Sequence, residues 1–523
     1  MKMSSAISRF MAGAAITLCL CGGSAMAADG LLWFADGRPA PQARQAIELL
    51  AAAASQGLEP QDYNASALQQ AIGQAAQGSA PEPVTVARLE AALTTALERY
   101  LSDLHRGRID PQRIHHNYHA PRSDGFEPAA YLRAAVQNQR LAQAAREAEP
   151  GLPLYARLRE ALGQYRERVG HPAWQQALPP LPGGKLAPGQ AYAGLAMLAQ
   201  RLAVLGDLAP GAPDAQLPPR YEGLLVDAVQ AFQLRHGLAA DGVVGKATLA
   251  QLQVTPAARA RQIALMLERL RWTPLTQSPR MIVINIPEFV LRAYEVRDGR
   301  IHVQQEMKVV VGKSLDTRTP LFDEDMRFIE FSPYWNIPPS IARAETVPKL
   351  RRDPGYLARE DMEFVSADGR VDQTVSAAQL DAVLAGRSRI RQRPGPKNAL
   401  GDIKFVFPNH DNIYLHHTPA TQLFERDRRD FSHGCIRVEQ PVALAKFVLK
   451  GMPEWTEDRI QKAMRRGQSA TLRLAEPVPV LIAYGTALVK EGRMFFLEDI
   501  YGLDRLLDAA LRQRTQNLSS IKE

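Results

Sequence analysis

Residues 432–437 read Ser-His-Gly-Cys-Ile-Arg, and this short stretch places an imidazole, a glycine and a thiol at consecutive positions. The chain has three cysteines, and two of them, Cys19 and Cys21, lie in an N-terminal segment that we expect to be removed. Cys435 is then the only thiol of the mature protein and has no intramolecular disulfide partner. In an oxidising compartment an unpaired thiol favours a reactive role.

A thiol nucleophile needs a nearby base and oriented backbone N–H groups that stabilise an oxyanion. Two histidines are candidates for the base, His416 and His433. His433 lies two positions before Cys435, so on an extended strand both side chains point to the same face. His416 ends another predicted strand, where it can meet the thiol across a sheet. Gly434 lets a substrate carbonyl approach the backbone, and the residues alone leave the choice of base open.

Two other interpretations of this stretch compete with a catalytic thiol. A structural zinc site would use His416, His417, His433 and Cys435, but the paired spacings typical of such sites are missing. A buried and inert cysteine is compatible with the composition. Apolar packing, however, gives no reason for the histidine and glycine beside it.

The N-terminal segment has the pattern of a secretory signal. Lys2 and Arg9 form a basic region, residues 10–20 are mostly apolar, and Ala25-Met26-Ala27 is a small-x-small cleavage site. The apolar run is shorter than the roughly 20 residues that span a membrane. We therefore expect cleavage after residue 27 rather than an uncleaved inner-membrane anchor.

Length and composition indicate a multidomain globular protein. A chain of 523 residues is expected to form two to four domains, and 46% apolar residues argue against a disordered chain. The formal charge of +8 becomes +6 without residues 1–27, which carry two basic groups and no acidic ones. This surplus suits anionic envelope polymers or a solvated surface. No basic run with interleaved aromatic residues indicates nucleic-acid binding.

The N-terminal half is predicted to be helical. Between residues 41 and 178 the clearest helix carries a leucine stripe at positions 89, 93, 97, 101 and 104. A Pro/Gly-rich stretch at 179–189 marks a boundary, so we expect a helical scaffold domain at 28–185. Residues 190–256 form a compact helical module. Its order Val-x-x-Phe-Gln, Gly-Leu, then Asp-Gly-x-x-Gly resembles the peptidoglycan-binding module of many cell-wall enzymes.

The following region, 281–440, is mostly β. Residues 281–286 are apolar and β-branched, and Asp298-Gly299 marks a hairpin turn. A charged, helix-tending insertion from about 338 to 396 interrupts the strands, and insertions of this length are usually functional, such as a mobile lid. The predicted fold is multidomain α+β, with a mainly helical N-terminal half and a mainly β catalytic domain at 278–510 that carries an inserted helical cap.

His416 is followed by 15 residues and then by Ser432-His433-Gly434-Cys435. This arrangement resembles the signature of the L,D-transpeptidases, cysteine enzymes that remodel peptidoglycan. Arg437 replaces the asparagine that is usual there, as in the large, multidomain branch of the family. The domain order and the stretches 334–338 and 398–401 also resemble that branch.

The resemblance implies roles for the residues around the thiol. Cys435 is the nucleophile, His416 transfers the proton, and the backbone carbonyl of His417 orients His416. His433 lies beside the tetrahedral intermediate, with the oxyanion near Gly434. The substrate-binding candidates are Ser432, Tyr414, Trp335 and Arg437. Arg437 either holds a stem-peptide carboxylate through a bidentate pair or forms a structural ion pair.

The resemblance also implies a function. We expect a periplasmic L,D-transpeptidase that forms 3→3 peptidoglycan crosslinks through a Cys435 thioester, without a cofactor or metal, and that carbapenems acylate. Its expected partners are donor and acceptor stem peptides and other cell-wall synthases. Alternatives are an L,D-carboxypeptidase, a lipoprotein-anchoring transferase and, from another class, a non-catalytic wall-binding scaffold.

Overall fold

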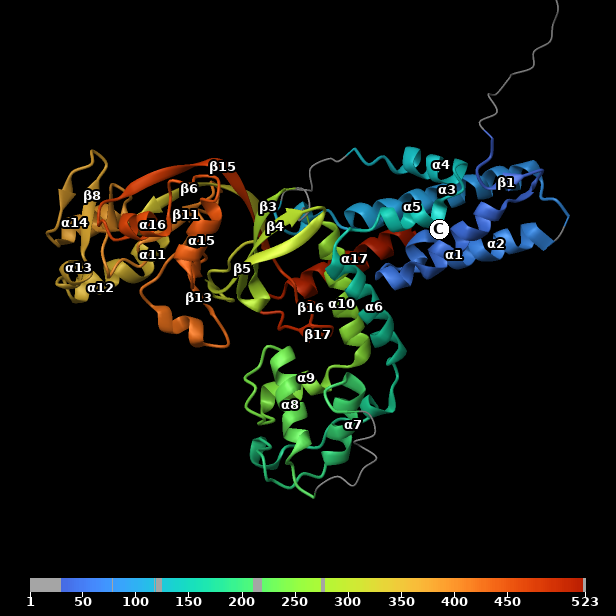
Figure 1. Ribbon diagram of the computed structural model, residues 1–523, viewed down its shortest axis with the longest axis horizontal. Coiled ribbons are helices and arrows are strands. Elements are labelled where there is room, and N and C mark those ends of the chain that lie inside the picture. The colour runs from blue at the N-terminus through green and yellow to red at the C-terminus, as the bar shows by residue number, and fades with distance from the viewer. Residues whose placement is uncertain are drawn as a thin grey trace, which may run out of the picture.

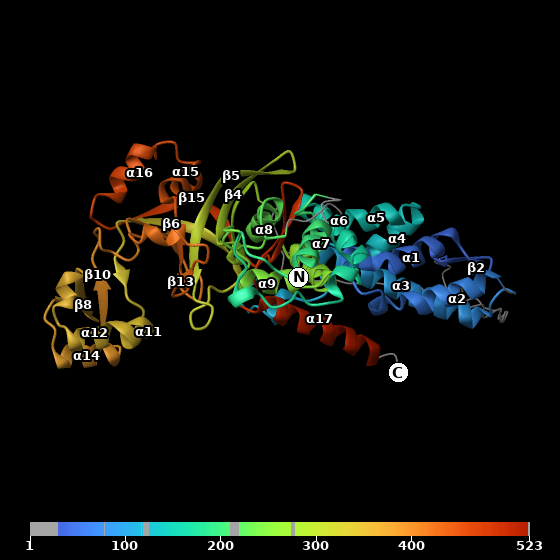
Figure 2. The same cartoon turned by 90° about the horizontal axis from the view of Figure 1, so that it is seen from below.

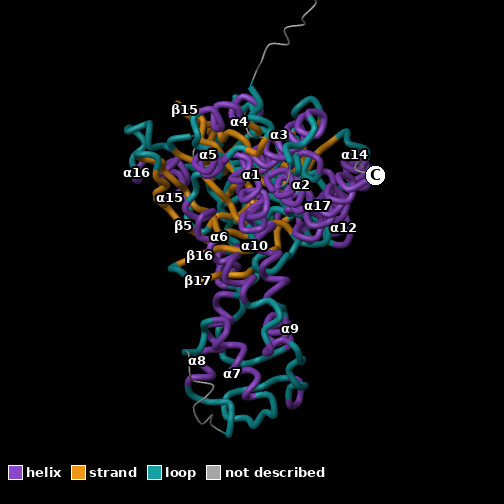
Figure 3. Tube along the Cα trace, turned by 90° about the vertical axis from the view of Figure 1, so that its right-hand side faces the viewer, coloured by secondary structure: helices purple, strands orange, loops and turns teal. Residues whose placement is uncertain are grey.

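The computed structural model describes residues 30–77, 79–116, 118, 125–209, 219–273 and 278–520. The expected signal segment, 1–27, lies outside the described residues. Figure 1 shows an elongated molecule with a helical region at one end and a β-rich region that continues into the inserted cap at the other. A smaller helical module projects from the middle, as the end-on view of Figure 3 also shows.

The helical region contains a short hairpin of β1 (Phe34–Ala35) and β2 (Arg38–Pro39), followed by α1 (Pro41–Ala51), α2 (Ala65–Gln77), α3 (Pro83–Arg106), α4 (Pro128–Gln137), α5 (Leu141–Glu147) and α6 (Pro153–Glu167). The predicted leucine stripe of α3 is buried along its whole length. Gly107 ends α3 at φ +84°, and a Cβ there would come within 2.6 Å of the Trp272 indole nitrogen. This close approach lets the chain leave α3 against the later helix α10.

The projecting module consists of α7 (Leu195–Leu205), α8 (Leu224–Arg235) and α9 (Lys246–Gln253). It has a hydrophobic core of its own, which includes Leu198, Leu202, Val229, Phe232 and Leu252. The turn at Gly242 has φ +73°, and the Tyr221 hydroxyl donates a 2.6 Å hydrogen bond to its carbonyl. The predicted helical module is therefore a separately packed unit, and α10 (Pro256–Arg271) leads from it to the β region.

The β region is built on a nine-stranded sheet in the order β13-β5-β14-β12-β11-β6-β15-β3-β4, and β4 also pairs with β5, so the sheet closes on itself. Its strands are β3 (Arg280–Asn285), β4 (Val290–Arg297), β5 (Arg300–Gly312), β6 (Phe322–Phe331), β11 (Ile403–Val406), β12 (Leu415–His416), β13 (Asp430–Ser432), β14 (Ile436–Val438) and β15 (Ala470–Ala483). The helices α15 (Pro441–Val448) and α16 (Glu457–Met464), the hairpin of β16 (Ala487–Lys490) and β17 (Arg493–Phe496), and α17 (Leu503–Ser520) complete it. The predicted mainly β region is confirmed.

The insertion is a small subdomain that extends beyond the sheet (Figure 2). It comprises β7 (Trp335–Asn336), α11 (Pro339–Ile341), a π-helical turn (Ala342–Thr346), α12 (Val347–Arg352), α13 (Tyr356–Arg359), β8 (Met362–Ser366), β9 (Val371–Asp372), α14 (Ala377–Leu384) and β10 (Ser388–Gln392). The predicted helices are present. A four-stranded sheet, β7-β10-β8-β9, was not predicted. Sheet and helices enclose a separate core that includes Leu350, Phe364 and Ile390.

A fully buried carboxylate joins the helical region to α10. Glu268 accepts hydrogen bonds from the backbone N–H groups of Arg108 and Ile109, and the Arg271 guanidinium lies 2.9 Å away. Burial raises the pKa of Glu268, but Arg108, Arg271 and the backbone donors outweigh burial, so the pKa lies below its ordinary value.

Replacing Glu268 by alanine should destabilise the helical region by about 3–5 kcal/mol, because two buried arginines lose their carboxylate. The lowered pKa means that this stability is present above the unfolded-state pKa, about 4.3, and is lost as the pH falls through the folded-state value. The midpoint of urea unfolding followed by helical circular dichroism measures both effects. Glu48→Ala, at an exposed position of α1, is the control. Equal midpoints for the two variants would contradict the prediction.

Candidate active site

The site is assembled by two very short strands that run in parallel. In the β12–β14 pair Leu415 lies opposite Ile436, and His416 lies opposite Arg437. The N–H of Ile436 donates a 3.0 Å hydrogen bond to the Tyr414 carbonyl. This register brings the two predicted segments, 414–417 and 432–437, side by side.

The Cys435 thiol is half-buried and unpaired. Its Sγ lies 3.6 Å from the Asn412 carbonyl oxygen, and the thiol interacts with the phenol of Tyr414. Burial raises the pKa of Cys435, while Tyr414 and the nearby cations Lys404 and Arg437 act in the opposite direction. Burial is the largest of these effects, so the pKa of Cys435 lies above its ordinary value.

His416 is almost fully buried, and its Nδ1 lies 2.5 Å from the backbone carbonyl of His417. A carbonyl oxygen only accepts, so Nδ1 carries the proton of the neutral ring and Nε2 is the basic nitrogen. Burial, followed by the charge of Arg437, lowers the pKa of His416 to about 3. The carbonyls of His417 and Leu400 raise this pKa, but by less. His416 is therefore neutral at pH 7. Within the described residues no hydrogen bond joins it to Cys435.

The side chain of His417 points elsewhere. Its Nδ1 lies 3.6 Å from an Asp402 carboxylate oxygen and 3.4 Å from the Asp402 backbone nitrogen. A Cβ at Gly401 would come within 2.5 Å of this ring, so Gly401 leaves room for it. Only the backbone of His417 thus reaches the ring of His416.

The side chain of His433 turns toward the inserted cap. Its Nε2 lies 2.6 Å from Oε1 of Glu345, which belongs to the π-helical turn of the cap. The chain is not extended between β13 and β14, because Gly434 has φ +112°. His433 and Cys435 therefore do not follow the strand geometry in which both would point to one face.

Buried hydrogen bonds fix the backbone around Gly434. The Thr319 hydroxyl donates to the Gly434 carbonyl at 2.7 Å and accepts from the Gly312 N–H at 2.9 Å. The Tyr501 hydroxyl donates to the Gly312 carbonyl at 2.6 Å and accepts from the Thr319 N–H at 3.3 Å. No sequence motif marked Thr319 or Tyr501, because three of these four contacts join positions 115 to 189 residues apart.

Ser432 closes the same loop from inside. Its hydroxyl donates to the Cys435 carbonyl at 2.5 Å and accepts from the Gly434 N–H at 3.2 Å, and the Thr317 hydroxyl donates to its carbonyl at 2.9 Å. Both bonds of the Ser432 hydroxyl thus go to the loop itself. Its position fits a residue that shapes the loop.

Arg437 is the cation beside the thiol and the histidine. Burial lowers its pKa, and Cys435 acts in the opposite direction. Its buried Nε has no hydrogen-bond partner, and among the described residues the side chain forms no ion pair. The alternative of a structural ion pair for Arg437 therefore finds no partner in the described part of the chain. Its guanidinium is left available for an external anion.

Two aromatic residues complete the surroundings of the thiol. The phenol of Tyr414 interacts with Cys435 and Trp335, and burial followed by Cys435 raises its pKa. Trp335 lies on β7, where the cap begins. The Lys404 ammonium lies 4.4 Å from the Tyr414 ring centroid and 3.1 Å from Glu330. In the described residues no group of three or more His, Cys, Asp or Glu side chains is arranged to hold a metal ion.

The raised pKa of Cys435 predicts how the resting thiol reacts. Alkylation by iodoacetamide should increase with pH and have its midpoint above about 8.5, the ordinary value of a cysteine. His416→Ala should change this midpoint little, because His416 is uncharged at neutral pH. The pH dependence of the alkylation rate measures both. A wild-type midpoint near 7 would instead indicate a preformed thiolate–imidazolium pair.

The Glu345–His433 contact holds the cap against the loop that carries Cys435, so we predict that it limits access to the thiol. Glu345→Gln should increase hydrogen exchange in the cap and the alkylation rate of Cys435 by up to about fivefold, since a hydrogen bond to a carboxylate is stronger than one to a neutral amide by about 1 kcal/mol. Glu360→Gln, elsewhere on the cap, is the control. If hydrogen exchange in the cap and alkylation of Cys435 are unchanged in Glu345→Gln, the Glu345–His433 contact does not control access to the thiol.

Comparison with known proteins identifies three segments. Residues 279–455 match the family model described as "L,D-transpeptidase catalytic domain", residues 27–162 match "Scaffold domain", and residues 193–252 match "Putative peptidoglycan binding domain". No helix in the described part of the chain is long and apolar enough to cross a membrane.

A curated relative from Haemophilus influenzae, named "Putative L,D-transpeptidase", is 33% identical over 253 residues, which cover 48% of this chain and 49% of the relative. The chain thus spans about half the length of that relative. A solved structure, that of Bd1075 from Bdellovibrio bacteriovorus, is 13% identical over 47% of this chain and 55% of the other, with a TM-score of 0.17, too low to indicate a function. Residues 279–455 thus match an L,D-transpeptidase catalytic domain, and this segment follows segments that match a scaffold domain and a peptidoglycan-binding domain.

Proposed function

We propose that this protein forms 3→3 crosslinks in peptidoglycan through a thioester on Cys435. The observation that carries the proposal is the β12–β14 register, which places a neutral, oriented His416 beside the strand that follows Cys435, within the segment that matches the catalytic domain. The donor is a tetrapeptide stem, and the bond attacked joins the L-centre of meso-diaminopimelate to terminal D-alanine.

In the first step the Cys435 sulfur attacks the donor carbonyl while its proton passes to Nε2 of His416. Thiol and imidazole are both uncharged in the resting site, so proton transfer accompanies the attack. The negative charge that develops on the carbonyl oxygen is held by backbone N–H groups near Gly434 and Cys435. The carbon–nitrogen bond then breaks, and D-alanine leaves with the proton from His416.

In the second step the side-chain amine of another stem attacks the thioester carbonyl. His416 accepts a proton from this amine, the carbon–sulfur bond breaks, and the sulfur of Cys435 recovers the proton. The products are the free thiol and an amide between two diaminopimelate residues. The fixed backbone around Gly434 supports both steps, because it holds the Cys435 N–H in place as an oxyanion donor, whereas the Gly434 N–H is bonded to the Ser432 hydroxyl.

We assign substrate contacts to the groups around the thiol. The unpaired guanidinium of Arg437 suits a stem-peptide carboxylate, which it can hold through two parallel hydrogen bonds. Tyr414, which interacts with both the thiol and Trp335, offers the substrate an aromatic surface beside the thiol. Ser432 acts on the substrate indirectly by shaping the loop. His433 contacts Glu345 of the cap, and we assign it a position beside the tetrahedral intermediate.

The location and partners are part of the same proposal. The basic region, apolar run and small-x-small site of residues 1–27 support export and a periplasmic mature protein. Other cell-wall synthases are candidate partners, since they supply the strands to be joined. Carbapenems are expected to acylate Cys435, and such an adduct would separate an enzyme from a non-catalytic wall-binding scaffold.

Purified protein incubated with disaccharide tetrapeptides should release D-alanine and yield dimers with 3→3 crosslinks, as measured by mass spectrometry. Cys435→Ala should abolish both products. His416→Ala should lower the rate by about 10²–10⁴-fold, the contribution of general acid–base catalysis. His302→Ala, at an exposed position on β5, is the matched control. Tripeptides without dimers would reassign the enzyme as a carboxypeptidase, and transfer only to a lipoprotein lysine would reassign it as an anchoring transferase.

A further inference from the structure

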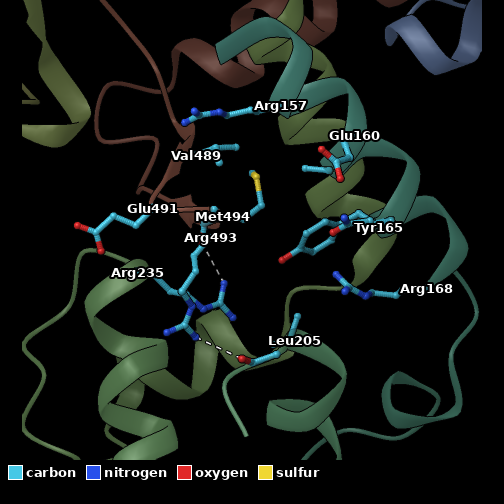
Figure 4. Close-up of a pocket in the computed structure, with 14 residues that line it drawn as sticks. Arg157, Glu160, Tyr165, Arg168, Leu205, Arg235, Val489, Glu491, Arg493 and Met494 are labelled. Atoms are coloured by element: carbon cyan, nitrogen blue, oxygen red, sulfur yellow. Dashed lines mark hydrogen bonds between the residues drawn. The ribbon is translucent and has the colours of Figure 1, made fainter. Parts of the chain in front are cut away.

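A cavity of about 590 Å³ lies where the scaffold region, the helical module and the C-terminal hairpin meet. Its walls come from α6, the ends of α7 and α8, and the β16–β17 hairpin, and Figure 4 shows the side chains that line it. Four of these side chains are arginines, at positions 157, 168, 235 and 493. In Figure 1 the hairpin lies beside α6 and above α8, whereas the cap lies at the far end of the sheet.

Two of the arginines share one buried carboxylate. Arg235 donates from Nε to Asp207 at 2.6 Å, and Arg493 donates to the same carboxylate at 2.8 Å. Arg235 also donates to the Met494 carbonyl at 3.2 Å, which joins the end of α8 to β17. The side chain of Asp207 is fully buried, so this wall of the cavity is rigid and carries two guanidinium groups for one carboxylate.

The other two arginines, Arg157 and Arg168, line the cavity from α6 and its C-terminal end, and among the described residues neither has a carboxylate partner. Arg157 and Arg168 are eleven positions apart, three turns of helix, and therefore lie on the same side of α6. The Arg168 guanidinium lies 5.0 Å from the Tyr165 ring centroid. Within the described ranges neither arginine forms an ion pair. Figure 4 shows Tyr165 and Arg168 across the cavity from Arg235 and Arg493.

Two acidic side chains, Glu160 and Glu491, also line the cavity, but both are exposed and neither is bonded to one of its arginines. Counting Asp207, four guanidinium groups face three carboxylates. A cavity with free guanidinium forks suits a ligand that carries carboxylates, which arginine recognises through two parallel hydrogen bonds. The volume lies within the range of about 300–1,000 Å³ typical of ligand sites.

We propose that this cavity binds the free carboxylates of a peptidoglycan stem peptide, at a second site apart from the Cys435 thiol. The ligand class rests on the proposed function, since stem peptides are also the donor and acceptor of the reaction. Arg235 and Asp207 belong to the segment that matches a peptidoglycan-binding domain, and Arg157 belongs to the segment that matches a scaffold domain. A strand held here is bound by the module and the scaffold together.

The test uses the full-length protein with Cys435 alkylated, so that no turnover occurs, and a disaccharide tetrapeptide as the probe. The double variant Arg157→Gln/Arg168→Gln should bind this probe about tenfold more weakly than the unsubstituted protein in isothermal titration calorimetry. The matched control is Arg88→Gln/Arg133→Gln, which removes the same charge from exposed positions on α3 and α4 and should bind normally. Circular dichroism should show equal folding for all three proteins.

Two further probes test the chemistry of the ligand. The same muropeptide with amidated carboxylates should bind the unsubstituted protein weakly and should not distinguish the variants. A peptide-free glycan strand should not bind in an Arg157- and Arg168-dependent way. The proposal is overturned if the double variant and the matched control bind the tetrapeptide equally, or if the peptide-free glycan depends on these arginines. Turnover by the unmodified wild type, measured in parallel, decides the proposed function separately.

Discussion

The parallel pairing of β12 with β14 is the constraint on which the candidate site depends. The two strands contain two and three residues, so they cannot form a stable pair by themselves. They are held because β11 flanks β12 on one side and β5 flanks β14 on the other, inside a closed sheet. A slip of one residue would turn His416 to the opposite face and separate it from the thiol. The surrounding strands therefore maintain the register between β12 and β14.

The same burial that fixes His416 also sets its chemistry. A buried imidazole next to Arg437 cannot easily hold a proton, and a thiol among close neighbours cannot easily lose one. The resting pair is consequently neutral, and the site does not hold a preformed reactive thiolate. In the proposed mechanism the charge is created only when a carbonyl arrives, at the point where the backbone around Gly434 is already fixed by Thr319 and Ser432. Reactivity is thus coupled to the presence of substrate.

The sequence predicted those parts of the protein that follow from local patterns. The leucine stripe of α3, the separate helical module and the β-rich region appear as expected because periodicity and turn residues determine them locally. The residues around Cys435 were identified because they are close in sequence or match a spaced motif. Their geometry was less predictable. The positive φ of Gly434 turns His433 away from the strand face, and its partner Glu345 lies 88 positions earlier.

The contacts that the sequence did not reveal are mainly buried polar contacts between distant segments. Thr319 and Tyr501 are ordinary residues in sequence, and only folding gives their hydroxyl groups a function. The cap sheet was missed because its strands have two to five residues, too short to show an alternating pattern. Such contacts are specified by the complete arrangement of hydrogen-bond donors and acceptors.

Helix α10 connects the separate parts of the molecule into one frame. It is buried on nearly every side, which is unusual for a helix with so many charged residues. Gln262 donates to the carbonyls of Thr486 and Leu497 at 3.0 and 3.1 Å, and Arg269 lies 2.5 Å from Asp504 at the start of α17.

These bonds hold the C-terminal segment that carries Tyr501. Tyr501 in turn hydrogen-bonds to Gly312 and Thr319, which lie beside the loop of residues 432–435. Polar side chains hold α10 in place. A shift of the helix would separate each buried charge from its partner, so the helix has little freedom to move. The position of the helical module relative to the thiol is therefore set by the same hydrogen bonds that shape the catalytic backbone. If the module binds a wall strand as proposed, that strand would lie at a fixed distance from Cys435. The part that could still move on binding would be the cap, which contacts the loop through Glu345 and His433.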